Sequence, residues 1–432
     1  MNIYRFPDQS LWKTLCRRPS LDQDALIRQV RAILEEVKLN GDAALKKLSL
    51  QFDGYAPESF RVTPEEMQQA RHELSEELIE AIGIARNNIE AFHRVQKSDP
   101  PKVTTMAGIS CWQKSVGIEK VGLYIPGGTA PLFSTILMLG IPAQIAGCKE
   151  IILCSPPSVD GKLPAVVLYT ASLLGIDQVY KVGGAQAIAA MSYGTTSVPA
   201  VHKIFGPGNQ YVTAAKQLVQ QNGVAIDMPA GPSEVAIFAD DTANAAFVAA
   251  DLLSQAEHGP DSQVLLVTTH EPLIAQVQKE LDAQLNMLPR AAIASRALDN
   301  SKIILVETAD QAMAFLNEYA PEHLILSVAE ADQRADEVMH AGSVFLGHYS
   351  PESAGDYASG TNHTLPTNGF AKAYSGVSVD SFCKKITYQQ LSVEGLMNIG
   401  PAIEIMASAE GLEAHKQAVS IRMAAIGREK EL

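Results

Sequence analysis

Residues 121–128 read Val-Gly-Leu-Tyr-Ile-Pro-Gly-Gly, an apolar run that ends in a proline and two glycines. The run has the length and composition of a buried strand, and its turn residues end it. The same order of strand, turn and helix recurs along the chain. Strands are expected near 121–125, 150–154, 178–181 and 201–205, and helices near 133–147, 163–174, 185–192 and 209–221. This alternation predicts a parallel sheet covered by helices on both faces.

Three of these strand ends carry glycine-rich turns that lead into helices. They are Pro126-Gly127-Gly128, Val182-Gly183-Gly184-Ala185-Gln186 and Phe205-Gly206-Pro207-Gly208-Asn209. Such turns let backbone N–H groups approach a phosphate at the N-terminus of a helix. None has the GxGxxG spacing of the common dinucleotide motif, and each alone also fits an ordinary tight turn. Taken together, the three turns are as consistent with a nucleotide-binding site as with three ordinary tight turns.

A second alternation of strands and helices starts at Glu234. Its strands are expected near 234–239, 263–268, 302–306, 323–328 and 343–346. A capping box at Thr63–Glu66 predicts a helix that runs to about residue 95, after a first helix at about 21–48. The division expected is an arm at 1–20, an α/β domain from 21–120 and 234–376, an inserted α/β domain at 121–233, and a helical tail at 377–432. The fold class is therefore α/β, with two Rossmann-like domains built on parallel sheets.

Composition narrows the class of partner. The formal net charge of −14 opposes binding to phosphate backbones, so nucleic acid is not expected as a partner. The five cysteines show no CxxC spacing, and the N-terminus lacks the pattern of a secretory signal. The most apolar segment, 132–147, is too short to cross a bilayer. A cytoplasmic protein without a membrane partner is the expectation.

The segment 251–262, DLLSQAEHGPDS, places Gln255 and His258 three residues apart at the end of a predicted helix. At this spacing both side chains share one helix face, which is half of a metal site. A histidine that only caps the helix is the alternative. The segment 320–323, APEH, precedes an apolar strand and brings two proton acceptors, Glu322 and His323, to a strand end. A solvated strand start is the alternative there.

Two further segments carry acidic residues and histidines among small residues. The loop 355–363, GDYASGTNH, holds Asp356, which is a suitable oxygen ligand for zinc, and His363. An ordinary polar turn would have the same composition. The segment 410–415, EGLEAH, opens a predicted helix with Glu410 and ends with His415. Acidic residues in a first helical turn often only complement the helix dipole.

These segments resemble those of the histidinol dehydrogenase family over essentially the whole chain. The resemblance rests on VGLYIPGG (121–128), VGGAQAIAA (182–190), FGPGN (205–209), AGPSE (230–234), LLSQAEHGPDSQ (252–263), APEHL (320–324), GDYASGTNHTLPT (355–367) and EGLEAH (410–415). It implies oxidation of L-histidinol to L-histidine through L-histidinal by two hydride transfers to NAD. It also implies a cytoplasmic homodimer in which the two subunits share each active site.

The resemblance further implies a role for each candidate residue. One zinc ion per subunit is expected on Gln255, His258, Asp356 and His415, with His415 coming from the other subunit. Glu322 and His323 are expected to be the acid–base pair, and NAD is expected against Tyr124, Gln186 and Asn209. The residues expected to contact substrate are Ser233, Gln255, His258, His323, Asp356, His363, Glu410 and His415.

Three other functions fit part of the pattern. A zinc hydrolase with Glu322 as its base would leave the glycine-rich turns without a purpose. A thiol-dependent aldehyde dehydrogenase is disfavoured because Cys154 lies in an apolar strand and is expected to be buried. A two-lobed solute-binding protein without catalysis is disfavoured, because the N-terminus lacks the pattern of an export signal and the chain carries several residues suited to proton transfer.

Overall fold

The computed structural model describes residues 1–19, 23–127, 131–229 and 231–429. The chain forms two compact units: Met1–Gln96 with Ile118–Phe382, and Lys97–Gly117 with Cys383–Leu432. Several predicted features fall outside the described residues. They are the start of the first helix at Leu21, Gly128 of the first glycine-rich turn, and Ala230 of the AGPSE segment.

A five-stranded parallel sheet forms one half of the larger unit, as the first alternation predicted. Its strand order is β6-β5-β4-β7-β8, with every pair parallel. The strands are β4 Lys120–Tyr124, β5 Glu150–Ser155, β6 Gln178–Lys181, β7 Lys203–Phe205 and β8 Ala225–Ile226. The helices between them are α6 Ser134–Ala146, α7 Ala165–Leu173, α8 Gly184–Tyr193 and α9 Gln210–Gln220. Because all these strands run the same way, the three glycine-rich turns meet at one edge of the sheet.

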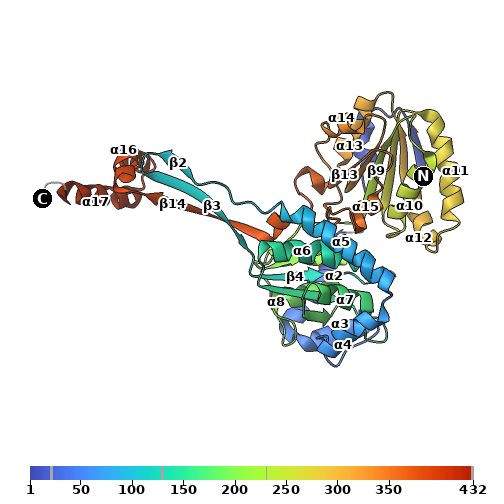
Figure 1. Cartoon of the computed structure of the whole chain (residues 1–432), viewed down its shortest axis with the longest axis horizontal. Coiled ribbons are helices and arrows are strands. Elements are labelled where there is room, and N and C mark those ends of the chain that lie inside the picture. The colour runs from blue at the N-terminus through green and yellow to red at the C-terminus, as the bar shows by residue number, and fades with distance from the viewer. Residues whose placement is uncertain (20–22, 128–130, 230, 430–432) are drawn as a thin grey trace. The chain divides into compact units, whose positions relative to one another are not determined.

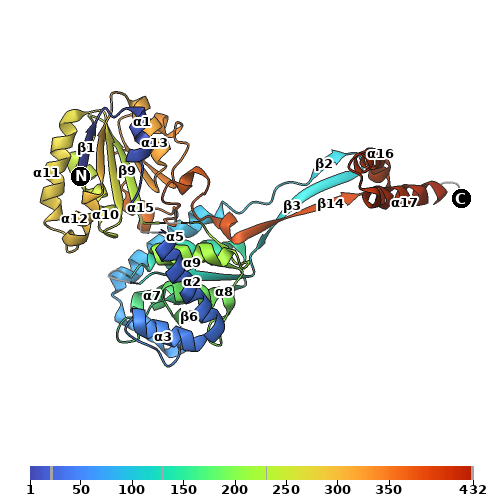
Figure 2. The ribbon, with the colours of Figure 1, turned by 180° about the vertical axis from the view of Figure 1, so that it is seen from behind.

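The helices at the N-terminal end of the chain pack on this five-stranded sheet. Helices α2 Gln23–Asn40 and α3 Asp42–Phe52 bury apolar side chains, among them Val30 and Leu45, in one core with α8 and α9. Figure 2 shows α2 beside α9. The assignment of residues 21–120 to the domain of residues 234–376 was therefore wrong for these helices. Periodicity identifies an apolar helix face but not the sheet on which it packs.

The long helix predicted from Thr63 to about residue 95 is divided in two. The capping box is present, since Thr63 accepts from Glu66 N and the Glu66 side chain accepts from Thr63 N. Helix α4 Pro64–Ala70 ends in a 3-10 turn at Arg71–Glu73, and α5 Glu76–Arg94 then begins. Ser75 caps α5 by accepting from Leu78 N at 3.2 Å. Helix α5 packs against α6.

A six-stranded parallel sheet forms the other half of the larger unit. Its order is β1-β11-β10-β9-β12-β13. The strands are β1 Asn2–Arg5, β9 Glu234–Ala239, β10 Gln263–Thr268, β11 Lys302–Leu305, β12 His323–Ser327 and β13 Ser343–Leu346. Figure 1 shows α10 Ala245–Ala256, α11 Glu271–Leu285 and α12 Ala291–Asp299 over one face, with α13 Ala309–Tyr319 over the other. The predicted arm at 1–20 is part of this body, because it supplies edge strand β1 and helix α1 Gln9–Leu15.

The smaller unit contains a three-stranded antiparallel sheet and two helices. The strands are β2 Val103–Met106, β3 Ile109–Gly117 and β14 Cys383–Leu391, in the order β14-β3-β2. Helices α16 Val393–Ala409 and α17 Glu413–Glu429 follow β14 and pack together. The predicted helical end of the chain is therefore confirmed, but strand β14 precedes its two helices. Strand β14 is a polar run exposed on nearly every residue, so its sequence lacks the alternation of a half-buried strand.

Helix α6 covers the most apolar segment of the chain. Its 13 residues are buried almost throughout, including Ile136, Leu137 and Met138. Along the described ranges, no helix combines the length and apolarity needed to span a membrane.

Candidate active site

Glu322 and His323 lie at the start of β12, in the interior of the larger unit. Their residues are only 7% and 3% exposed, so the alternative of a solvated strand start is excluded. In the sheet, His323 lies between Val235 of β9 and Ser343 of β13. The pair therefore occupies the amino-terminal edge of the six-stranded sheet. Helix α10 runs antiparallel to the strands, so its last turn reaches the same edge.

The peptide backbone of Glu234 holds both side chains. Its N–H donates to Oε2 of Glu322 at 2.9 Å, and its carbonyl oxygen lies 3.1 Å from Nδ1 of His323. A carbonyl can only accept, so this contact places the imidazole proton on Nδ1. The other ring nitrogen, Nε2, is then left unprotonated. It faces Asp356, whose Oδ1 lies 3.3 Å away.

Three of the four predicted metal ligands belong to this part of the molecule. Gln255 lies in the last turn of α10, and His258 follows the end of that helix. Asp356 lies on α15 Glu352–Tyr357. Nε2 of Gln255 is 3.4 Å from Nδ1 of His323, and Oε1 of Gln255 is buried with no hydrogen-bond partner among the described residues. An amide oxygen left free in this way suits a metal ligand.

The fourth predicted ligand, His415, and the predicted substrate residue Glu410 belong to the smaller unit. Glu410 is the C-cap of α16, and His415 lies in the first turn of α17. Both are exposed. Within the larger unit, Gln255 and Asp356 lie near His323, and His258 interacts electrostatically with Asp356.

Glu352 is a buried acid that the sequence analysis missed. It is fully buried, and neither carboxylate oxygen has a hydrogen-bond partner within the described ranges. Oε1 lies 3.9 Å from Nδ1 of His323. One ligand atom each from His323, Glu352 and Asp356 lie within 4.8 Å of one another, which is a spacing that could hold a cation. The spacing of Glu352 and Asp356, four residues apart, was the signal available in the sequence, because such residues share a helix face.

Burial and charge shift the pKa values of the catalytic pair. Burial raises the pKa of Glu322 to about 8, although the attraction of His323 opposes this. Burial alone would lower the pKa of His323, but the carboxylates of Glu352, Glu322 and Asp356 outweigh it and raise the pKa well above its usual value. The charge of Glu322 and the charge of His323 each shift the pKa of the other residue, so a proton can be held on either side chain.

The two remaining predicted substrate residues lie beside this centre. His363 Nδ1 is 2.8 Å from the carbonyl oxygen of Asp356, and its Nε2 is 3.0 Å from Oγ1 of Thr135 on α6. Burial lowers the pKa of His363, which favours the neutral ring. Ser233 immediately precedes Glu234 and is half-buried. Both residues therefore belong to the surroundings of the pair.

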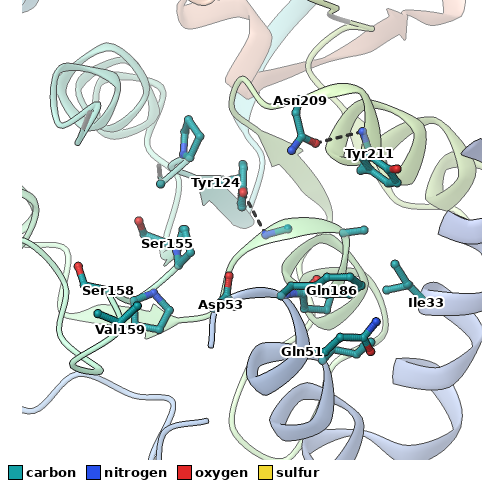
Figure 3. Close-up of a pocket in the computed structure, with 18 of the residues that line it drawn as sticks. Ile33, Gln51, Asp53, Tyr124, Ser155, Ser158, Val159, Gln186, Asn209 and Tyr211 are labelled. Atoms are coloured by element: carbon teal, nitrogen blue, oxygen red, sulfur yellow. Dashed lines mark hydrogen bonds between the residues drawn. The ribbon is translucent and has the colours of Figure 1, made fainter. Parts of the chain in front are cut away.

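A pocket of about 1110 Å³ lies at the carboxyl edge of the five-stranded sheet (Figure 3). All three residues predicted to bind the cofactor line it, namely Tyr124, Gln186 and Asn209. The Tyr124 hydroxyl accepts a hydrogen bond from Gly184 N at 3.0 Å. The Asn209 side chain caps α9 by accepting hydrogen bonds from the backbone N–H groups of Tyr211 and Val212. The pocket is large enough for part of a dinucleotide.

The glycines of the three turns are needed for packing within the protein. A side chain at Gly127 or at Gly183 would collide with the ring of Pro156. Gly206 has φ = 130°, and a side chain there would collide with the backbone carbonyl of Tyr124. The turns therefore pack closely against the neighbouring segments, a role that the sequence alone does not separate from phosphate binding.

The histidinol dehydrogenase family model matches residues 16–423. The chain is 57% identical to histidinol dehydrogenase of Bacteroides thetaiotaomicron over 98% of its own length and 99% of the relative's. It is 52% identical to that of Vibrio cholerae, covering 98% and 97% of the two chains. The crystal structure of histidinol dehydrogenase from Elizabethkingia anophelis superposes with a TM-score of 0.96 at 54% identity, covering 99% of each chain. The chain belongs to the histidinol dehydrogenase family.

As a member of the histidinol dehydrogenase family, the chain is an oxidoreductase of histidine biosynthesis. Cys154 is fully buried, and burial strongly raises the pKa of its thiol, which opposes the thiol-dependent mechanism considered above.

Several residues that line the pocket were not predicted from the sequence. The sequence analysis missed lining residues from the N-terminal helices and from the loop after β5. They include Gln29, Ile33, Phe52, Asp53, Pro156 and Val159. Those on the N-terminal helices were missed because these helices were assigned to the other sheet.

Proposed function

We propose that the protein oxidises L-histidinol to L-histidine through L-histidinal, using two molecules of NAD and one zinc ion per subunit. The observation that supports this most is the pair Glu322 and His323, held by the backbone N–H and the backbone carbonyl of Glu234 beside Gln255 and Asp356. Such a pair can move protons at two successive steps. The names of the relatives supply the substrate class.

Gln255, His258 and Asp356 are proposed to hold the zinc ion. They offer one amide oxygen, one imidazole and one carboxylate, which is a donor set that zinc accepts. The unpartnered Oε1 of Gln255 supports this choice. His323 is within reach of the same cluster, but we assign it to proton transfer. When bound, zinc supplies a fixed positive charge that holds the non-reacting part of the substrate in place.

Tyr124, Gln186 and Asn209 are proposed to contact NAD. When bound, NAD accepts the hydride that leaves the carbinol carbon. Gly184, Gln186 and Asn209, at the N-termini of α8 and α9, line the pocket, and a helix N-terminus favours a pyrophosphate. The loop from Ser155 to Val159 closes another side of the pocket.

In the first oxidation, the neutral form of the His323 ring, which its raised pKa makes the minor form near neutral pH, removes the proton of the substrate hydroxyl with Nε2. The hydrogen bond from Nδ1 to the Glu234 carbonyl keeps Nε2 free for this proton. The imidazolium that forms is stabilised by the carboxylates of Glu352, Glu322 and Asp356 around it, which also raise its pKa. The neutral ring of His363, between Thr135 and the Asp356 carbonyl, contacts the substrate without competing for the proton.

In the second oxidation, Glu322 activates water for attack on the aldehyde. Its raised pKa, about 8, makes its carboxylate a stronger base than an ordinary glutamate. The hydrate that forms has a new hydroxyl, whose proton passes to His323 as the second hydride leaves. Two carbon oxidations and one water account for the change from alcohol to acid.

We propose that the enzyme is a homodimer. Apolar side chains of the smaller unit are exposed, including Ile405, Met406 and Ile421, and a second copy would cover them. His415 of the partner subunit is proposed to complete the zinc site, and Glu410 of the partner subunit to contact substrate. The free cysteines suit a reducing compartment, so we place the enzyme in the cytoplasm.

An assay of NADH formation with L-histidinol tests the proposed function. Purified protein should reduce NAD only when L-histidinol is present, and 1,10-phenanthroline should remove the activity. Added zinc should restore it. A protein that forms no NADH from L-histidinol would contradict the proposal.

A further inference from the structure

Asp53 is a half-buried acid in the proposed NAD pocket for which the mechanism above has no role. It follows α3 and lines the pocket together with Tyr124 and Gln186, as Figure 3 shows. The neighbouring Ser49 hydroxyl interacts with its carboxyl and opposes the rise that burial causes in its pKa, but Oδ2 is buried and has no hydrogen-bond partner of regular geometry among the described residues. A buried carboxylate oxygen with no donor is costly, and it is expected where a ligand supplies the donor.

Gln186 offers the matching donor. Its residue is 1% exposed, and its Nε2 also has no hydrogen-bond partner in the described part of the chain. Asp53 acts on the same region, because its charge adds to burial in raising the pKa of Tyr124 to about 12. A free acceptor and a free donor in one pocket are complementary to a pair of ribose hydroxyls, each of which can donate and accept.

The two charged residues that line the pocket are both acidic, and Lys47, outside the lining, binds one of them, Glu36, at 2.7 Å. Among the described lining residues Asp53 and Glu36 carry formal charge, and neither lysine nor arginine is present. A phosphate monoester carries between one and two negative charges at neutral pH, so it would meet a desolvated carboxylate and no cation. Burial raises the pKa of Asp53 to about 6, which leaves the carboxylate ionised at neutral pH.

We propose that Asp53 accepts a hydrogen bond from the adenosine ribose of NAD and, through its charge, excludes the 2′-phosphate of NADP. This inference rests on the proposed NAD-dependent function. The assignment of Asp53 to the adenosine half of the cofactor is part of the proposal, and binding of ADP-ribose and of its 2′-phosphate tests it. Asp53 is thus a specificity-determining residue that acts together with Gln186.

Calorimetric binding of ADP-ribose and of 2′-phospho-ADP-ribose to the full chain tests this without requiring turnover. The wild-type protein should bind ADP-ribose at least tenfold more tightly than it binds 2′-phospho-ADP-ribose. Asp53→Ala should weaken ADP-ribose about tenfold, because it removes the acceptor. Asp53→Asn keeps one acceptor oxygen and removes the charge, so it should lower the preference for ADP-ribose about tenfold.

Glu58→Gln is the matched control, because Glu58 is exposed and outside the pocket, and its replacement removes the same charge. It should leave both affinities unchanged. In steady-state assays, Asp53→Ala should raise KM for NAD and leave kcat within about twofold, since ribose binding is equal in ground and transition states.

Unchanged affinities and an unchanged preference in both Asp53 variants, with circular dichroism like that of wild type, would overturn the role of Asp53. That result would leave the proposed function standing if wild type still forms NADH from L-histidinol. A wild-type protein that binds neither ADP-ribose nor NAD would overturn the proposed function together with this inference.

Discussion

The guanidinium of Arg18 binds the carboxylate of Glu234 through two contacts, Nε to Oε1 at 3.0 Å and Nη2 to Oε2 at 2.9 Å. Both side chains are buried, at 8% and 1% exposure. The guanidinium also lies 3.6 Å from the centre of the Tyr319 ring. Because the backbone of Glu234 holds Glu322 and His323, this ion pair fixes the peptide on which the proposed chemistry depends.

Replacement of Arg18 by methionine should therefore affect both stability and catalysis. It leaves a buried carboxylate unpaired, so we expect the free energy of unfolding to fall by about 3 kcal/mol. We also expect kcat to fall for both oxidations, since Glu322 and His323 lose a fixed support. Urea unfolding and steady-state rates with L-histidinol and L-histidinal measure these effects.

The double variant Arg18→Met, Glu234→Gln is the control for that prediction. Without the buried charge on Glu234, removal of Arg18 should cost less than it does alone. Additive losses in the double-mutant cycle would show that the ion pair is not the cause.

The division of labour between the catalytic residues can be tested by two isosteric replacements. His323→Asn should reduce both oxidations by about a hundredfold or more, because each requires a proton to leave a hydroxyl. Glu322→Gln should impair oxidation of L-histidinal more than oxidation of L-histidinol, because only the aldehyde requires activated water. Equal losses in the two half-reactions for Glu322→Gln would refute this assignment.

The close packing of the third glycine-rich turn predicts the effect of a single methyl group. Gly206→Ala should lower the melting temperature and weaken NAD binding, because its side chain would collide with the Tyr124 carbonyl. Gly223 is the matched control, since it also has positive φ (88°) but nothing within 4 Å of an added Cβ. Gly223→Ala should therefore show only the smaller cost of backbone strain. Similar losses in both variants would mean that strain, and not the collision, decides the effect at Gly206.

The raised pKa of Asp53 predicts a change of stability with pH. Its carboxyl has a pKa of about 6 in the folded state and an ordinary value near 3.8 in the unfolded state. The folded state therefore binds the proton more tightly, and its stability falls as pH rises through this interval. Asp53→Asn removes that penalty, so its melting temperature should exceed that of wild type by more at pH 8 than at pH 5. A difference that does not depend on pH would contradict the burial of this charge.

Much of the fold could be predicted from the sequence because its strands are short apolar runs ended by glycine or proline. Strands β9 and β10 begin and end where the pattern placed them. The packing of α2 and α3 could not be predicted, since an apolar helix face fits either sheet. Strand β14 was missed because both of its faces are exposed, and a strand of that kind shows no hydrophobic alternation.

The candidate site could be predicted only where its residues are close together in the sequence. Glu322 and His323 are adjacent in sequence, so their shared position at a strand start could be predicted. His258 lies beyond the end of α10, so the predicted helix face that it would share with Gln255 is not formed. Glu234 acts through its backbone, and any residue at that position offers the same N–H and carbonyl. Glu352 and Asp53 are acids in apolar surroundings whose burial depends on segments distant in sequence. No local pattern distinguishes Asp53 from an exposed acid, and for Glu352 the only local signal was its spacing of four residues from Asp356.

The ratio of NADH formed to L-histidinol consumed tests the central claim most directly. A limiting amount of L-histidinol is incubated with the enzyme, excess NAD and zinc, and NADH is measured by absorbance while L-histidine is measured by chromatography. Two NADH and one L-histidine per L-histidinol, with both products lost on chelation of the metal, is the predicted result. One NADH with release of L-histidinal, or a yield that chelation does not change, would contradict the proposed two-step, zinc-dependent oxidation.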